Sequence, residues 1–217
     1  IPSRRTAQQA DAYRIPERHV IGPGVPTVPQ YVASRAVRYR RLTMDPEDLL
    51  AAIQERLGYR FRDPTLLRDA LTHRSFFNER PDLAPRHNER MEYLGDSVFG
   101  LAASVLLYHH YPEAREGELT RRRADMVCEP ALAAIATHLG LGEALRLGHG
   151  EEKSGGRVKP RLLASALEAL IAAVSLDGDE REAITLARAL LAPYLDAMSP
   201  GELDYKSRLQ EKLQVDG

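Results

Sequence analysis

The chain has 217 residues, enough for one full domain plus additional segments, and 43% of them are hydrophobic, which suffices for a buried core. Cys128 is its single cysteine, so an intrachain disulfide framework is excluded and a reducing, cytoplasmic compartment is expected. No run approaches the roughly 18 to 20 apolar residues of a membrane span, so no membrane partner is expected. Alanine and leucine are plentiful and tryptophan is absent, which favours an all-α protein.

The net charge of −1 conceals an asymmetry along the chain. Residues 1–43 hold eight arginines and two acidic residues, a balance of +6, whereas the other 22 basic and 29 acidic residues give −7. Five prolines and the lack of a sustained period predict that residues 1–43 form a mostly disordered basic arm, with an organelle transit peptide as the weaker alternative. Residues 44–217 are acidic overall, so binding of a nucleic acid to them would require local basic patches, metal ions or a segment that is missing.

Apolar residues at helical spacing predict seven helices in the rest of the chain. Capping residues and prolines indicate their starts, as at Asp45 and Pro46, and glycine or proline indicates several of their ends, as at Gly58. Two polar segments rich in proline or glycine, residues 78–86 and 149–156, are expected to be loops. The predicted helices cover residues 46–57, 65–75, 89–111, 113–127, 129–148, 160–179 and 180–198.

Three acidic residues are predicted to share one face of the helix that begins in HNERMEYLGDSVFG, residues 87–100. Glu89, Glu92 and Asp96 follow the i, i+3, i+7 pattern of a helical face. Carboxylates on one face repel one another unless cations meet them, and carboxylate oxygens suit Mg²⁺. A solvated acidic surface is the alternative. An apolar stripe is expected on the opposite side, formed by Met91, Leu94, Val98, Leu101 and Val105.

Other polar residues have two interpretations each. Glu168 is the only acid between Pro160 and Asp177, so it must be paired, neutral or metal-bound, unless it lies at an exposed position or in a salt bridge to arginine. Lys153 lies in a glycine-rich loop that could approach phosphate, but the loop lacks a Walker pattern. Cys128, in an apolar helical run, is expected to be a buried thiol and not a nucleophile.

The segment 87–100 closely resembles the signature box of the ribonuclease III family, with HNER, an acid three residues later, and then LGDS. EGELTRRRA, LGLGEALRLGHGEEKSGG and ALEALIAAV match further family segments in order. The resemblance implies an all-α, helical ribonuclease III endonuclease domain over residues 44–199 that dimerises through its signature helix. Residues 200–217 resemble a linker and the truncated start of the family's double-stranded-RNA-binding domain.

The resemblance also implies roles for individual residues. The catalytic acids would be Glu92, Asp96 and Glu168, which would also bind metal, together with Glu89 near the dimer and substrate surface. A second group would lie near the substrate, with Asn88 in a supporting role. This group consists of Glu116, Lys153, Ser154 and Asn88.

One position departs from the family pattern. Ser165 replaces an expected aspartate one helical turn before Glu168, and it is therefore a doubtful metal ligand. The change removes one of four expected negative charges, so we expect weaker metal binding and slower turnover without automatic loss of activity. Losing a residue that supports a metal site in this way typically lowers metal affinity or activity ~10- to 100-fold.

The implied function is that of an endoribonuclease that uses Mg²⁺, with Mn²⁺ as a substitute, and cuts double-stranded RNA as a homodimer. Its products would carry 5′-phosphate and 3′-hydroxyl ends, and its substrates would be structured RNAs such as ribosomal RNA precursors. The alternative, favoured by Ser165, is a catalytically impaired duplex-RNA-binding or ribosome-associated relative that keeps the fold and the dimer. Cleavage that depends on a divalent metal separates the two.

Overall fold

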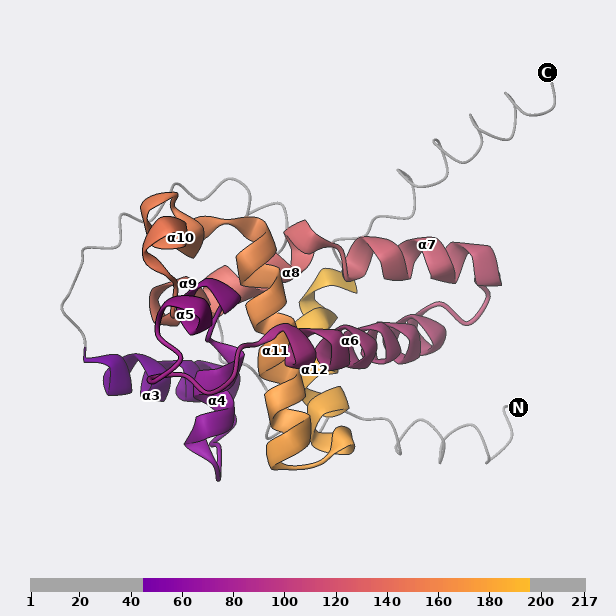
Figure 1. Ribbon diagram of the computed structural model, residues 1–217. Coiled ribbons are helices and arrows are strands. Elements are labelled where there is room, and N and C mark those ends of the chain that lie inside the picture. Colours follow the sequence, from indigo (N-terminus) through magenta and orange to yellow (C-terminus); the bar gives the residue numbers. More distant parts are fainter. Residues whose placement is uncertain (1–44, 196–217) are drawn as a thin grey trace, which may run out of the picture.

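The computed structural model describes residues 45–195, so the predictions for the arm at 1–43 and for residues 200–217 lie outside the described residues. Within 45–195 the chain is helical, without a strand, and helices joined by short loops surround one central helix (Figure 1). The helices are α3 (Pro46–Leu57), α4 (Pro64–Ala70), α5 (Arg74–Glu79), α6 (Glu89–His110), α7 (Glu116–Met126), α8 (Glu129–Leu139), α9 (Leu141–Ala144), α10 (His149–Lys153), the 3₁₀ helix η2 (Gly156–Val158), α11 (Pro160–Asp177) and α12 (Glu180–Leu195).

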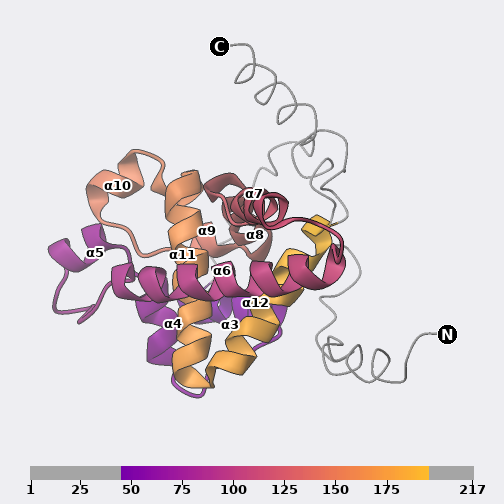
Figure 2. The ribbon, with the colours of Figure 1, turned by 90° about the vertical axis from the view of Figure 1, so that its right-hand side faces the viewer.

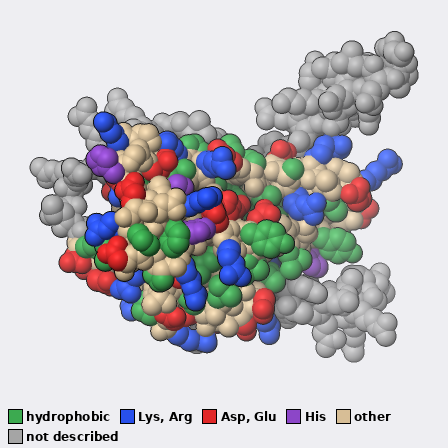
Figure 3. All heavy atoms as spheres, in the orientation of Figure 1, with side chains coloured by type: hydrophobic (Ala, Val, Ile, Leu, Met, Phe, Trp, Pro, Cys, Tyr) green, Lys and Arg blue, Asp and Glu red, His purple; other side chains and the backbone are tan. Residues whose placement is uncertain are grey.

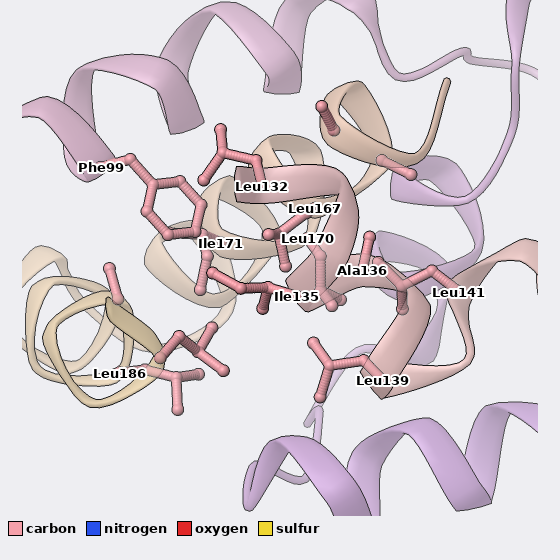
Figure 4. Close-up of a cluster of buried hydrophobic side chains, with 14 of the residues drawn as sticks. Phe99, Leu132, Ile135, Ala136, Leu139, Leu141, Leu167, Leu170, Ile171 and Leu186 are labelled. Carbon is pink, nitrogen blue, oxygen red and sulfur yellow. The ribbon is translucent and has the colours of Figure 1, made fainter. Parts of the chain in front are cut away.

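Helix α11 is the central element, as its apolar sequence predicts. It is buried along most of its length and is crossed by α6 in both views (Figure 1, Figure 2). Its core neighbours come from α6, α8 and α12, and each fully buried leucine or phenylalanine contributes about 1.5–3 kcal/mol relative to exposure. Figure 4 shows this cluster, which includes Phe99, Leu132, Ile135, Leu167, Leu170, Ile171 and Leu186.

The predicted continuous helix over 65–75 is wrong. Helix α4 ends at Ala70 and α5 begins at Arg74, because the intervening backbone pairs with a distant segment. The Arg146 N–H donates to the Leu71 carbonyl (2.9 Å), and the His73 N–H donates to the Arg146 carbonyl (3.0 Å). This pairing turns the chain so that α5 lies beside the start of α6.

Three other boundaries also differ from the prediction. The helix predicted over 129–148 is divided at Gly140, whose φ of 75° ends α8, and the Arg56 guanidinium donates to the free Leu139 carbonyl (3.0 Å). The segment 149–156, predicted as a loop, contains α10, and α5 extends to Glu79 inside the other predicted loop. Neither short helix has an apolar period long enough to be recognised in the sequence.

The buried face of α6 is rotated from the predicted one. It centres on Gly95, Phe99 and Ala102. Met91 and Val98 are buried as predicted, whereas Leu101, also predicted to be buried, is 50% exposed. The acids of this helix therefore lie at the edge of its buried face and not opposite to it.

Cys128 was predicted to be a buried thiol within a helix. It is instead half-buried at the start of α8, and its thiol donates to the Asp125 carbonyl.

No helix among the described residues has both the length and the apolar character that crossing a membrane requires.

Candidate active site

The site begins with a close crossing of α6 and α11 at Gly95. A Cβ atom on this glycine would lie 1.8 Å from the backbone oxygen of Glu168, so only glycine allows the two backbones to approach this closely. Glu92 precedes Gly95 by one helical turn and Asp96 follows it directly. The crossing therefore brings both carboxylates to the part of α11 that carries Glu168.

Glu168 has the electrostatic properties of a carboxyl group held among other carboxylates. Its partial burial, with the nearby negative charges of Glu92 and Asp96 as smaller causes, raises its pKa from 4.5 to about 7. In the described part of the chain Glu168 takes part in none of the ion pairs or side-chain hydrogen bonds. Neither alternative from the sequence holds, because the side chain is half-buried and has no arginine partner.

The three carboxylates form an open cluster and not a closed ligand shell. Among residues 45–195, no group of three or more His, Cys, Asp or Glu side chains is already drawn together as a metal site. Mg²⁺ usually takes one or two protein carboxylates and keeps several waters, so a tight shell is not needed. Burial of Glu168 without a basic partner, beside the negative charges of Glu92 and Asp96, is a cost that a hydrated divalent cation at this position would reduce.

Ser165 lies one turn before Glu168 on α11 and is half-buried. Its hydroxyl takes part in none of the hydrogen bonds found within residues 45–195. By contrast, the hydroxyls of Ser97 and Ser104 on α6 each donate to a backbone carbonyl one turn earlier, at 3.4 and 2.8 Å. The Ser165 hydroxyl is thus available to a water molecule or ligand beside Glu168, although it brings no charge.

Asn88 and Glu89 hold the start of α6 in place. Asn88 is 2% exposed, and its backbone N–H donates to the Thr72 carbonyl (2.9 Å), while its side chain makes no cap hydrogen bond. Glu89 is paired with Arg74 of α5 (Nη1 to Oε1, 3.4 Å) and lies 3.7 Å from the His87 ring. These contacts give Asn88 an anchoring position, and they tie Glu89 to α5 and not to the carboxylate cluster.

The predicted substrate residues Lys153 and Ser154 lie at the end of α10, which packs against α5. Lys153 is exposed, and the Ser154 hydroxyl donates to the Glu151 carbonyl (3.0 Å) and accepts from Lys159 (2.8 Å). Lys159 is also ion-paired with the Glu151 carboxylate. Figure 3 shows acidic, basic and histidine side chains gathered on the face where α5, α10 and α11 meet.

Glu116 lies far from Glu92, Asp96 and Glu168 of the same chain. It is the first residue of α7, which follows the far end of α6, and Glu92 lies about 27 Å from that end at 1.5 Å per residue (Figure 1). Thr120 donates to its carboxylate (2.9 Å). If Glu116 acts near these acids, it does so from another copy of the chain.

His73 and Arg74, beside the acidic end of α6, were not singled out from the sequence. The segment TLLRDALTHRS has a helical apolar period, which predicts one continuous helix where the structure has α4, a break at 71–73 and the start of α5. No local signal indicates the pairing of this segment with Arg146, 73 residues away. The shared face of Glu92 and Asp96 follows from their spacing within α6, whereas the approach of Glu168 on α11 was expected only from the family resemblance.

Fold and site together define an all-α domain whose longest helix presents acids to a buried central helix. A model of the Ribonuclease-III-like family matches residues 63–195. The protein named Ribonuclease 3 of Pelotomaculum thermopropionicum is 47% identical over 175 residues, which are 80% of this chain and 73% of the relative. The Ralstonia pickettii protein of the same name is 49% identical over 167 residues, 76% of this chain and 62% of the relative.

Solved structures agree with these sequence matches. The nuclease domain of ribonuclease III from Campylobacter jejuni superposes with a TM-score of 0.61 at 38% identity, over 65% of this chain and 95% of that one. That structure is described as flexible in a region involved in dimer formation. The chain belongs to the ribonuclease III family, and this membership supports an endoribonuclease acting on RNA.

Proposed function

We propose that the chain is a divalent-metal-dependent endoribonuclease that cuts double-stranded RNA. The observation that carries the proposal is the close approach of α6 and α11 at Gly95, which brings Glu92 and Asp96 near a half-buried Glu168 that has no basic partner in the described chain. Three carboxylates in this state are destabilising unless a cation neutralises them. Mg²⁺ is the natural occupant because its ligands are oxygens, and Mn²⁺ would substitute for it.

The chain's own residues would orient the reaction. When bound, Mg²⁺ supplies a water of lowered pKa and positive charge for the phosphate oxygens. Glu92 and Glu168 are fixed by the backbone contact at Gly95, so they would hold the cation in a defined position. Asp96 is exposed and can reach a cation shared with the substrate. The hydroxyl of Ser165 would hold a water where an aspartate would add charge.

The active form is proposed to be a homodimer. Three large side chains on the outer face of α6, Tyr93, Leu101 and Tyr108, are 79%, 50% and 68% exposed. Their spacing of eight and seven residues places them on one face of the helix, which a second copy of the same helix could cover. This arrangement would also give Glu116 access to a neighbouring active site, which its own chain does not offer.

The proposed biological role is the processing of structured RNA, such as ribosomal RNA precursors, in the cytoplasm. Duplex RNA is recognised largely by its shape, its phosphates and its 2′-hydroxyls. The test compares end-labelled duplex RNA with its separate single strands in Mg²⁺, Mn²⁺ and excess chelator. We expect metal-dependent cuts in the duplex alone, with 5′-phosphate and 3′-hydroxyl products; equal cutting of single strands would contradict the proposal.

Ser165 favours a second candidate, a relative that binds duplex RNA but turns over slowly or not at all. With one expected negative charge missing, the remaining carboxylates could hold the cation too weakly for reaction. This candidate predicts that duplex RNA is retained on the chain but left uncut in Mg²⁺. Cleavage that appears only after Ser165→Asp would establish it.

A further inference from the structure

The imidazole of His73 is held by Ser75, which is in turn held by the segment at Gly148. Its Nδ1 accepts from the Ser75 backbone N–H (3.2 Å) and lies 2.8 Å from the Ser75 hydroxyl. That hydroxyl in turn accepts from the Gly148 N–H (2.9 Å). Gly148 can approach this closely only because it lacks a side chain, since a Cβ there would lie 2.7 Å from the Ser75 carbonyl.

These contacts fix the tautomer of the ring. A backbone N–H can only donate, so Nδ1 must be the unprotonated nitrogen that accepts from it. The Ser75 oxygen receives the Gly148 N–H, which leaves its own hydrogen free to point at the same Nδ1. In the neutral ring the proton is therefore on Nε2. Burial lowers the pKa of His73 despite the opposing effect of nearby Glu151, Glu89 and Glu92, so the ring stays neutral near pH 7.

The Nε2–H group is a donor that no protein group of the described chain uses. It forms none of the hydrogen bonds within residues 45–195, and the His73 side chain is only half-buried. Both neighbours of His73 contact the start of α6: the Thr72 carbonyl accepts from the Asn88 N–H (2.9 Å), and Arg74 is paired with Glu89 (3.4 Å). His73 therefore lies beside the first turn of the helix that carries Glu92, on the side of α5.

We propose that His73 is a substrate-positioning residue whose Nε2–H donates to a phosphate oxygen of the RNA strand beside the carboxylate cluster. The inference rests on the proposed ribonuclease function. A neutral donor can hold a phosphate next to the acids without pairing with them, which leaves their charge for the cation. A protonated histidine or a lysine at this position would compete with that cation for the same carboxylates.

Two substitutions separate the two nitrogens of the ring. In His73→Asn the side-chain oxygen can accept from the Ser75 N–H in place of Nδ1, but the Nε2 donor is lost. In His73→Gln the longer side chain can present an N–H near the position of Nε2, while the contact to Ser75 is lost. We expect His73→Asn to raise KM for duplex RNA about tenfold with kcat changed less than about threefold, and His73→Gln to recover most of the loss. Thermal unfolding controls for folding.

A phosphate modification identifies the contact itself. A methylphosphonate linkage lacks one charged oxygen of the phosphate. A set of RNA duplexes carries one such linkage each, at successive positions near the cut. At one position the modification should raise KM about tenfold for the unsubstituted chain. It should not raise KM further for His73→Asn, because that variant already lacks the same hydrogen bond. If the two effects multiply at every position, or if kcat falls while KM is unchanged, the proposal is overturned.

Binding in Ca²⁺ distinguishes this failure from failure of the proposed function. If the chain binds duplex RNA without cutting it, the dissociation constants of modified and unmodified duplexes are compared for the unsubstituted chain and His73→Asn. Effects that fail to add at one position support the role of His73, and effects that multiply at every position overturn it. A chain that neither binds nor cuts duplex RNA overturns both proposals. A chain that cuts normally, with effects that multiply throughout, overturns only the role of His73.

Discussion

At the scale of single residues, Glu168 couples the chemistry of the site to the stability of the fold. The raised pKa means that the native state keeps the Glu168 proton up to about pH 7, whereas the unfolded chain releases it near 4.5. Between these values the native state binds more protons than the unfolded state, so the free energy of unfolding falls as pH rises through this window. The carboxylate is therefore held in a conformation that is unfavourable without a cation.

We expect the metal-free chain to lose about 2 kcal/mol of unfolding free energy between pH 5 and pH 8, after discounting for partial solvent exposure. Urea unfolding at several pH values measures this loss, and Glu168→Gln, which cannot ionise, is the control. Saturating Mg²⁺ should flatten the profile because a bound cation favours the ionised form. Parallel profiles for the chain and Glu168→Gln would show that Glu168 is not the group responsible.

At the scale of elements, the contact between α6 and α11 sets the geometry of the site. Gly95→Ala would place a Cβ against the Glu168 backbone and force the two helices apart, so we expect a loss of about 2–3 kcal/mol together with loss of cleavage. Gly100→Ala on the same helix is the matched control. Its Cβ would meet nothing within 4 Å, and it should gain about 0.5–1 kcal/mol from reduced chain entropy.

Urea midpoints and cleavage rates of the two alanine variants test this account of the crossing. Equal stabilities would mean that α6 and α11 do not approach as closely as described. Activity in a destabilised Gly95→Ala would mean that the position of Glu92 relative to Glu168 tolerates a shift. Either result would separate the packing of the helices from the chemistry of the acids.

The elements also show what local sequence can and cannot predict. The limits of α3, the length of α6 and the burial of α11 follow from caps and apolar periods inside each segment, and all three predictions are confirmed. The break between α4 and α5 depends on backbone pairing with Arg146, which no local pattern indicates. The acids of α6 were found because their spacing is local, whereas His73 was missed because its surroundings come from two distant segments, the start of α6 and residues 146–151.

At the scale of the whole molecule, the exposed face of α6 predicts association. Leu101→Asp would place a charge in the middle of the face formed with Tyr93 and Tyr108, so we expect it to convert a dimer into a folded monomer. Leu176→Asp is the control, because Leu176 is 55% exposed on α11. Sedimentation velocity measures both variants. A dimer that survives Leu101→Asp would place the interface elsewhere.

We propose that Glu92, Asp96 and Glu168 hold a divalent cation for cutting duplex RNA although Ser165 supplies no charge. The most direct test is the rate of duplex cleavage as a function of Mg²⁺ concentration for the chain, Ser165→Asp and Glu168→Gln. We predict that the chain cuts only with metal, that Ser165→Asp needs about tenfold less Mg²⁺ for half the maximal rate, and that Glu168→Gln does not cut. Cleavage in excess chelator, or by Glu168→Gln at the rate of the unsubstituted chain, would contradict the claim.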